Sequence, residues 1–479
     1  MERLRNFVGG EWLDQGVDST DINPSDVKDV IAEYAQADSK VTADAIEASS
    51  NAANKWGTSN VQQRADILDS IGDEILNKRD ILGKLLSREE GKTLPEGIGE
   101  VTRAGNIFKF FAGETLRLTG DLVPSVRSGV DVEVIRQPVG VVGIIAPWNF
   151  PAAIPAWKIA PALAFGNSVV FKPANLVPAM AFELAKIIGN SGLPPGVFNF
   201  VMGKGSEVGD TIVNDDRVNA LSFTGSVDTG QEIAKKAVGR MAKFQLEMGG
   251  KNPLVILDDA DLDIAVQCAI NGAYFSTGQG CPASSRLIVT SRIHDKFINS
   301  MQEQLSKTIV DNALKEGTHI GPVVDKNQLN QDLFYIEKAK KEGAELAFGG
   351  RLLERDTEGF YLEPALFTQT KNEMTINQEE VFGPVASVIE VTDYEEALHL
   401  ANATDFGLSS GIVTSSLKHS SHFKKNAQAG MVMVNLPTAG VDYHVPFGGI
   451  KGSSYGSREQ GSYAKEFYTS VKTSYVFSG

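Results

Sequence analysis

The residue best suited to covalent chemistry is Cys281, one of only two cysteines in a chain of 479 residues. It lies in a glycine-rich turn, Gly278-Gln279-Gly280-Cys281, whose small neighbours would let a substrate reach the sulfur. A cysteine thiolate is a strong nucleophile. A single cysteine is more often a buried, inert thiol, and we interpret Cys268, within the helical run 264–270, in that way. Cys281 is therefore a candidate nucleophile, with an inert thiol as the alternative.

A second candidate is Glu247, a carboxylate that stands where a solvated glutamate is not expected. It lies in an apolar run just ahead of Gly249 and Gly250. Burial raises the pKa of a carboxylic acid toward the range in which it can act as a general base. The sequence therefore predicts either a general base at Glu247 or a structural acid held in a salt bridge.

Hydrophobic spacing indicates the elements that would position these residues. Between residues 40 and 115, apolar side chains recur at every third or fourth position, which is typical of amphipathic helices. From residue 138 onward, short apolar runs alternate with helical stretches and end at glycine or proline turns. This pattern predicts parallel β-α-β units and hence an α/β fold with a doubly wound sheet. The predicted strands are 139–145, 168–171, 198–202 and 220–223, and a helix is predicted at 177–190.

Ligands of a doubly wound sheet bind at the carboxyl ends of its strands. Asn149, Lys172 and the pair Gly225-Ser226 all follow predicted strands, so we expect them at one edge of the sheet. A helix is expected after Ser226, and a helix N-terminus offers free amide groups to a phosphate; an ordinary helix cap is the alternative. The segment 203–209 resembles the nucleotide-binding pattern G-x-G-x-x-G but is one residue too long, and a plain turn explains it equally well.

A second α/β segment follows Gly249-Gly250. It has predicted strands at 287–290, 383–392 and 409–414 and a predicted helix at 293–307. Residues 120–137 mix β-branched and polar residues, which indicates an extended hairpin or edge strand. The tail 467–477 alternates in the same way, and we expect it to pair with the 120–137 segment of another subunit.

The composition argues against several classes of function. The formal net charge of −15 disfavours nucleic acid as a partner, because phosphate binding needs basic patches. The six histidines form no HExxH motif or Cys/His cluster, so we predict no metal site. The most apolar stretch, 139–146, is far shorter than the roughly 20 residues that cross a bilayer, and the first residues lack the apolar core of a signal peptide. With only two cysteines, the sequence predicts a cytoplasmic protein without a membrane partner.

Seven motifs make the chain resemble the aldehyde dehydrogenase superfamily along essentially its whole length. They are Pro147-Trp148-Asn149-Phe150-Pro151, Lys172-Pro173-Ala174, Phe223-Thr224-Gly225-Ser226, Leu246-Glu247-Met248-Gly249-Gly250, Gly278-Gln279-Gly280-Cys281, Glu380-Val381-Phe382-Gly383-Pro384 and Pro446-Phe447-Gly448-Gly449. The resemblance implies a small-molecule aldehyde substrate and a homodimer or homotetramer. It also implies a Rossmann-type cofactor domain (1–119 and 138–248), an α/β catalytic domain (249–448) and a small β oligomerisation arm (120–137 and 462–479).

The same resemblance implies chemical roles. Cys281 would attack the aldehyde, and the amide of Asn149 would hold the oxyanion. Hydride transfer to a nicotinamide would leave a thioester, which water activated by Glu247 would hydrolyse. Lys158 and Glu459 would take part in proton relay. The residues expected to contact the NAD or NADP cofactor are Ile145, Ala146, Pro147, Trp148, Lys172, Asn175, Gly205, Gly225, Ser226, Gly249, Glu380 and Phe382.

One departure from the family pattern concerns the cofactor. Many NAD-preferring members carry a glutamate where this chain has Asn175. That glutamate would hold the ribose 2′-hydroxyl and repel a 2′-phosphate, whereas neutral Asn175 does not repel it and Lys172 can pair with it. We therefore expect NADP to be accepted alongside NAD, and preferred in the stronger form of the prediction.

A second departure concerns the C-terminal motif and the substrate. Ser454 replaces a family glycine and Ser457 adds one residue, which weakens the role implied for Glu459. This variant resembles the branch of the family that oxidises 2-oxoglutarate semialdehyde (2,5-dioxopentanoate) to 2-oxoglutarate. Succinate semialdehyde dehydrogenases tend to carry an arginine where Trp157 stands, which counts against that substrate.

Three points stay open at this level. The residue that would bind a substrate carboxylate is not ranked among Ser285, Arg286, Tyr443 and His444, although Arg286 fits a structural role better. Succinate semialdehyde, or a simple aliphatic or aromatic aldehyde, is the alternative substrate. A non-catalytic binding or structural family member is the alternative of a different class, and the presence of both Cys281 and Glu247 counts against it.

Overall fold

The structure is a computed structural model that describes residues 3–477 and 479. It confirms the helices predicted between residues 40 and 115, which are α1 (Ser39–Gly57), α2 (Val61–Asn77), α3 (Arg79–Glu90) and α4 (Leu94–Thr115). The apolar stripe of α2, which includes Leu68, Ile71 and Ile75, is fully buried and packs against α4. A capping box formed by Thr93 and Glu96 starts α4.

The alternating half of the chain forms an eight-stranded sheet with a parallel centre, as predicted. Its strands, in spatial order, are β22 (Ser454–Tyr455), β12 (Lys243–Glu247), β11 (Ala220–Thr224), β8 (Val141–Ile145), β9 (Ser168–Lys172), β10 (Phe198–Phe200), β2 (Asn6–Val8) and β3 (Glu11–Leu13). Its helical segments are α5 (Ala153–Ala164), α6 (Pro178–Gly189), η1 (Gly205–Gly209), α7 (Asp210–Asn214) and α8 (Val227–Gly239). Every residue of β9 and β11 is buried, as central parallel strands require.

The structure also contains antiparallel strands toward both edges of this sheet and a small N-terminal sheet, which the sequence pattern does not predict. β22 pairs with β12 at one edge, and β2 pairs with β10 at the other. A separate three-stranded sheet contains β1 (Arg3–Leu4), β5 (Val30–Gln36) and β4 (Val17–Ile22). We predicted none of these strands, because they are at most seven residues long and several lack an alternating pattern.

The second α/β segment forms a seven-stranded sheet that is parallel except at β15. In spatial order the strands are β15 (Glu345–Phe348), β16 (Ala365–Thr368), β17 (Val385–Val391), β14 (Arg286–Thr290), β13 (Pro253–Ile256), β19 (Ser409–Val413) and β20 (Met431–Val434). The helical segments of this part are α9 (Leu262–Tyr274), η2 (Phe275–Gly278), α10 (Ser291–Ser306), α11 (Lys326–Lys341), α12 (Thr375–Gln378), α13 (Tyr394–Asn402) and α14 (Leu417–Asn426). A two-stranded ribbon pairs β18 (Phe406–Gly407) with β21 (Ile450–Lys451).

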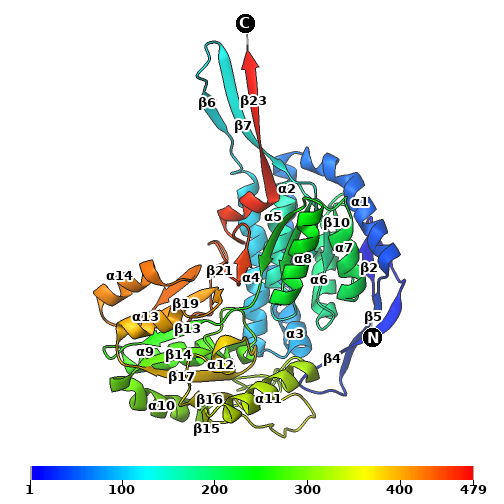
Figure 1. Cartoon of the computed structure of the whole chain (residues 1–479). Coiled ribbons are helices and arrows are strands. Elements are labelled where there is room, and N and C mark those ends of the chain that lie inside the picture. Colours follow the sequence, from blue (N-terminus) through cyan, green and yellow to red (C-terminus); the bar gives the residue numbers. More distant parts are fainter. Residues whose placement is uncertain (1–2, 478) are drawn as a thin grey trace.

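A three-stranded arm projects from the rest of the chain and ends at the C-terminus (Figure 1). It contains β6 (Asp121–Pro124), β7 (Val130–Pro138) and β23 (Thr469–Phe477), and η3 (Ser462–Ala464) and α15 (Lys465–Tyr468) lead into it. β23 pairs along its whole length with β7 of the same chain, so the expected pairing with another subunit is wrong. The reason is local: Lys243 donates to the carbonyls of Glu466 and Thr469, and Arg136 pairs with Glu466 at 2.7 Å, which anchors the tail beside its own hairpin.

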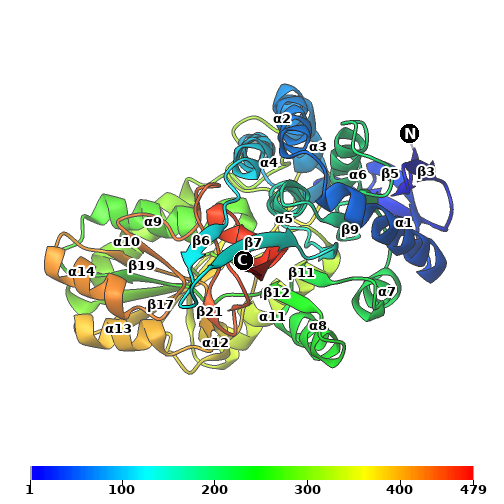
Figure 2. The same cartoon turned by 90° about the horizontal axis from the view of Figure 1, so that it is seen from above.

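The two large sheets stand in separate lobes of the molecule (Figures 1 and 2). Each sheet has apolar clusters of its own, with Phe171 and Val170 buried around the first sheet and Leu287 and Ile288 around the second. Within the described residues, no helix is both long enough and apolar enough to cross a membrane.

Candidate active site

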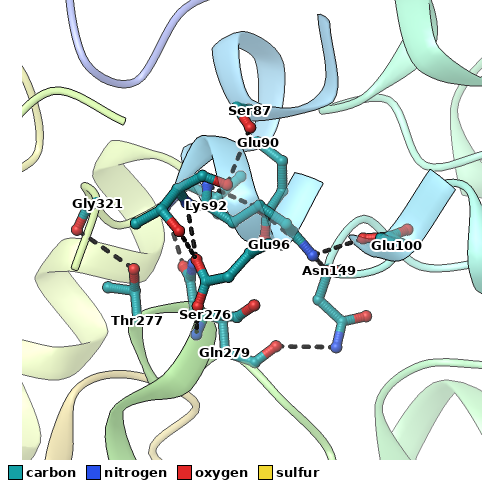
Figure 3. A network of polar contacts seen from close by, with 12 residues as sticks. Ser87, Glu90, Lys92, Glu96, Glu100, Asn149, Ser276, Thr277, Gln279 and Gly321 are labelled. Carbon is teal, nitrogen blue, oxygen red and sulfur yellow. Dashed lines mark hydrogen bonds and ion pairs between the residues drawn. The ribbon is translucent and has the colours of Figure 1, made fainter. Parts of the chain in front are cut away.

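Cys281 follows a strained turn at the end of α9. Ser276 and Thr277 have left-handed backbones, with φ of 48° and 58°, and this conformation costs roughly 1–2 kcal/mol per residue. Two hydrogen bonds stabilise the turn: the Ser276 amide donates to Glu96 over 2.8 Å, and the Thr277 hydroxyl donates to the Gly321 carbonyl over 3.2 Å (Figure 3). The half-buried Cys281 that follows lines a cavity of about 590 Å³.

Asn149 places an amide donor beside the thiol. It follows β8, and its Nδ2 atom lies 3.9 Å from Cys281 Sγ and donates to the Gln279 carbonyl over 2.9 Å. Its Oδ1 atom is buried without a hydrogen-bond partner. A donor that faces the sulfur also faces the oxygen of a carbonyl group that the sulfur attacks, which is the arrangement of an oxyanion hole.

Lys92, just before α4, and Glu96 and Glu100, within it, hold the segment that contains Asn149 and the turn before Cys281. We call these three residues the α4 clamp. Lys92 Nζ donates to Glu100 over 2.6 Å and to the Asn149 carbonyl over 2.8 Å (Figure 3). Glu100 also accepts from the backbone amides of Ala152 and Ala153, at 2.8 and 3.1 Å. Because Glu96 holds the turn before Cys281, the clamp fixes the thiol and the amide relative to one another.

Glu247 ends β12 and is buried beside the same cavity. Its Oε2 atom accepts the Ser454 hydroxyl over 2.6 Å, and that hydroxyl in turn accepts the Gly449 amide over 2.7 Å. Burial, and next the nearby carboxyl group of Glu459, raise the pKa of Glu247 well above its usual value. Ser454, which departs from the family glycine, is therefore a direct partner of the candidate base.

Lys158 and Glu459 form a buried ion pair behind Glu247, so the structure brings together the two residues expected in proton relay. Lys158 Nζ also donates to the Ser222 hydroxyl over 2.9 Å, and Gln245 Nε2 donates to Glu459 over 2.8 Å. The second carboxylate oxygen of Glu459 is buried without a partner. The extra residue at Ser457 therefore does not displace Glu459 from this cluster.

The carboxyl ends of β9 and β11 carry buried polar groups with few partners. Lys172 Nζ donates to the carbonyl of Pro173, and burial lowers the pKa of Lys172 to about 8. The side-chain oxygens of Asn175 and Thr224 are buried without partners. Unpaired buried polar groups are costly, so this strand edge has the donors and acceptors that a nucleotide would satisfy.

Glu380 and Phe382 reach the same region from the second sheet. Glu380 accepts the Gly250 amide over 2.8 Å, and burial raises its pKa to about 7. A side chain at Gly249 would meet the Glu380 carboxylate at 2.3 Å, so that carboxylate would have to move. Phe382 packs edge-on against Trp148, with ring centroids 5.4 Å apart. These contacts place Glu380 beside Gly249 and Phe382 beside Trp148, and all four are expected cofactor residues.

The other expected cofactor residues lie near the carboxyl ends of the strands of the first sheet, and most of them show no unpaired buried polar group. Ile145 ends β8, Pro147 follows it, and the amide of Ala146 donates to the Lys172 carbonyl over 3.1 Å. Gly225 follows β11, and a side chain on it would meet the Phe223 ring at 2.6 Å. The Ser226 hydroxyl bonds to Thr229 Oγ1 at 2.9 Å rather than capping α8. Gly205 begins the exposed η1 turn.

The cavity that Cys281 lines distinguishes among the four residues considered for binding a substrate carboxylate. Tyr443 lines it, whereas Ser285, Arg286 and His444 do not. Arg286 is fully buried and donates to Asn372 Oδ1 over 2.7 Å, so its role is structural, as expected.

We missed the residues that α4 contributes to the site. Glu96, Glu100 and Arg103 are spaced i, i+4 and i+7, so they share one face of the helix. All three line the cavity. Charges repeated on one helical face were the available signal, but the same spacing is common on solvated helices. Among residues 3–477 and 479, no group of three or more His, Cys, Asp or Glu side chains is placed to hold a metal ion.

Comparison with known proteins identifies the family. Residues 12–474 match the model of the aldehyde dehydrogenase family. An alpha-ketoglutaric semialdehyde dehydrogenase of Bacillus subtilis is 43% identical over 475 residues, covering 98% of this chain and 97% of that protein. A 2,5-dioxopentanoate dehydrogenase of Saccharolobus solfataricus is 40% identical, covering 98% and 99%. A Staphylococcus aureus betaine aldehyde dehydrogenase solved with NAD+ has a TM-score of 0.97 at 34% identity, covering 99% and 95%. The chain therefore belongs to the aldehyde dehydrogenase family.

Proposed function

We propose that this enzyme oxidises 2-oxoglutarate semialdehyde to 2-oxoglutarate with NAD or NADP. The observation that carries the chemistry is that the Cys281 thiol and the Glu247 carboxyl group line one cavity, while the Asn149 amide contacts the thiol at 3.9 Å. The substrate is supported by the two relatives above, whose names denote the same compound, since alpha-ketoglutaric semialdehyde is 2,5-dioxopentanoate.

In the proposed mechanism, Glu247 first activates the thiol. Burial, together with the carboxyl groups of Glu380 and Glu247, raises the pKa of Cys281 to about 12, so the sulfur is protonated at neutral pH. As Sγ bonds to the aldehyde carbon, its proton passes to Glu247 and the carbonyl oxygen becomes an oxyanion. The Asn149 amide, which already lies 3.9 Å from the sulfur, stabilises that charge.

The second half of the mechanism releases the acid. A bound nicotinamide ring supplies the acceptor for the hydride that leaves the thiohemiacetal carbon. Glu247 passes the thiol proton on and is ionised again before water attacks the thioester that remains on Cys281. It then takes a proton from that water, and as the carbon–sulfur bond breaks, the leaving sulfur takes this proton back and the thiol is restored. We propose that the Lys158–Glu459 pair receives the proton from Glu247, which is supported by the effect of Glu459 on the pKa of that residue.

We propose that Lys172 and Asn175 hold the adenosine ribose, and that the site accepts NADP as well as NAD. Gly205, Gly225 and Ser226 would lie along the adenosine and pyrophosphate, and Glu380 would hold the nicotinamide ribose. The neutral Asn175 does not repel a 2′-phosphate, and a phosphate would stabilise the charge of Lys172. The test is the ratio of kcat/KM for the two cofactors. An NAD preference above about 1000-fold, or ~4 kcal/mol, would contradict the proposal.

We also propose the division into a cofactor domain (1–119 and 138–248), a catalytic domain (249–448) and an arm (120–137 and 462–479). The separate apolar clusters of the two sheets support it. The arm would join copies of the chain into a homo-oligomer, because its outer strands leave unpaired edges and Phe477 is 69% exposed. Removing 469–477 should lower the molecular mass measured by light scattering.

The proposed location is the cytoplasm. Both cysteines of the chain are free, and a reducing compartment would keep the nucleophile Cys281 reactive. The net charge of −15 supports a small molecule rather than nucleic acid as the partner.

Steady-state kinetics over a set of aldehydes tests the substrate. We expect kcat/KM for 2,5-dioxopentanoate to exceed that for propanal by at least about 10-fold. A second candidate, a general aliphatic or aromatic aldehyde, is favoured by the aromatic wall of the cavity, where Trp157 stacks on Phe447 with centroids 5.2 Å apart. Equal efficiency for propanal, benzaldehyde and 2,5-dioxopentanoate would support that candidate and overturn ours.

A further inference from the structure

Arg103 is the only basic side chain among the described residues that line the Cys281 cavity. It extends from α4 on the same face as Glu96 and Glu100. The cavity wall around it is largely apolar and includes Trp157 and Phe447. A charge in such surroundings is costly unless it is paired.

The guanidinium group is held in place before any ligand arrives. Nη1 donates to the Val441 carbonyl, and Nη2 donates to Gln460 Oε1 over 2.9 Å. The group also lies over the Trp157 ring, 5.8 Å from its centroid. Because the side chain is already ordered, an anion that binds it does not pay for freezing its rotamers.

The hydrogen bonds of Arg103 leave its positive charge available. Its two bonded partners are neutral oxygen atoms, and its Nε atom is buried without a partner. The nearby carboxylates are committed or solvated: Glu100 binds Lys92 and two backbone amides, and Asp442 is exposed. Among the described residues, the cavity therefore offers one fixed cation that has no direct ion-pair partner, with Glu100 and Asp442 as the nearby carboxylates.

We infer that Arg103 binds the carboxylate of an oxo-acid substrate while the aldehyde at the other end of the same molecule reaches Cys281. This inference rests on the proposed function and names its specificity residue. Both groups line one cavity, so a single short chain can contact both. A guanidinium N–H donates strongly to a carboxylate, whereas a neutral aldehyde gains nothing from it. Arg103 therefore favours a semialdehyde acid over an uncharged aldehyde.

The test compares Arg103→Met with the wild type on two substrates, 2,5-dioxopentanoate and the uncharged pentanal. Methionine keeps much of the side-chain volume but removes the charge. We expect kcat/KM for 2,5-dioxopentanoate to fall about 10- to 100-fold, mainly through KM, because hydrogen bonds to a charged group are lost. Activity on pentanal should stay within about twofold, and Arg103→Lys should restore part of the loss. Equal losses on both substrates, or no loss on either, would overturn the inference.

Arg240→Met is the matched control. Arg240 is also partly buried and donates to two backbone carbonyls, those of Val213 and Val218, but it lies outside the cavity. We expect it to leave the ratio of the two substrates unchanged, and a ratio that changed as in Arg103→Met would contradict specific binding. As a second readout, 2-oxoglutarate should bind Cys281→Ser at least about 10-fold more tightly than the same protein carrying Arg103→Met, by calorimetry. If the wild type itself does not prefer 2,5-dioxopentanoate to pentanal, the proposed function fails first; if it does and Arg103→Met keeps that preference, only this inference fails.

Discussion

The α4 clamp and the carboxyl ends of β9 and β11, which we call the proposed nucleotide edge, both contain buried polar groups, but they differ in whether those groups have hydrogen-bond partners. In the clamp, Lys92 and Glu100 bind one another and three backbone groups around Asn149. At the carboxyl ends of β9 and β11, the side-chain oxygens of Asn175 and Thr224 have no partner. Buried groups without partners destabilise a fold. The paired groups of the clamp therefore fix the position of Asn149, and the unpaired groups at the strand ends are available to bind a ligand.

The largest expected effect comes from replacing Cys281, the proposed nucleophile. Cys281→Ala removes the nucleophile without touching the clamp or the strand edge. We expect turnover to fall by about 1000-fold or more, while the affinity for NADP measured by fluorescence titration stays within about threefold. If Cys281→Ala kept turning over at the wild-type rate, the covalent mechanism would be wrong.

Breaking the clamp should cost stability as well as rate. Lys92→Met leaves Glu100 buried without its cation, and removing one partner of a buried pair costs about 3–5 kcal/mol. Urea unfolding should show this loss, and kcat should fall more than KM changes. Lys40→Met is the control, because its pair with Asp44 is exposed and should leave the midpoint near that of the wild type. A wild-type midpoint for Lys92→Met would mean that the clamp is not structural.

Adding a charge at the proposed nucleotide edge should change cofactor choice. In Asn175→Glu, a carboxylate would accept from the ribose hydroxyl of NAD and repel the 2′-phosphate of NADP. We expect the kcat/KM ratio to move about 10- to 100-fold toward NAD, with kcat for NAD nearly unchanged. The paired control is Asn175→Gln, which adds length without charge and should move the ratio little; an equal shift in both variants would remove the electrostatic explanation.

The smallest effect should come from Ser454, which joins the C-terminal loop to the base. Its hydroxyl donates to Glu247 and so stabilises the ionised form, which lowers the pKa of Glu247. Ser454→Ala should therefore raise that pKa and move the acid limb of the kcat–pH profile to higher pH. At alkaline pH, where Glu247 is ionised in both proteins, kcat should agree within about twofold. Ser457→Ala should leave the profile in place, and an unchanged limb in Ser454→Ala would contradict the role.

Much of the fold and of the candidate site could be predicted from the sequence, for identifiable physical reasons. The strand predicted at 139–145 is a continuous apolar run that ends before a proline turn, so both its type and its functional edge follow from the pattern. The α4 clamp could not be predicted in this way, since Lys92 acts on Asn149, which lies 57 residues later in the chain. The pairing of β23 was misjudged because alternation shows that a strand needs a partner and not which chain supplies it.

The most direct test of the mechanism uses Glu247→Gln, which keeps the shape of the base but cannot take a proton from water. Mixed with NADP and 2,5-dioxopentanoate in a stopped-flow experiment, it should reduce about one cofactor per active site and then stall. That single reduction should be slower than in the wild type, because the Cys281 thiol has also lost the base that takes its proton. Digestion and mass spectrometry should then find the acyl group on Cys281. Continued turnover at the wild-type rate, or an acyl group on any other residue, would contradict the assignment of nucleophile and base.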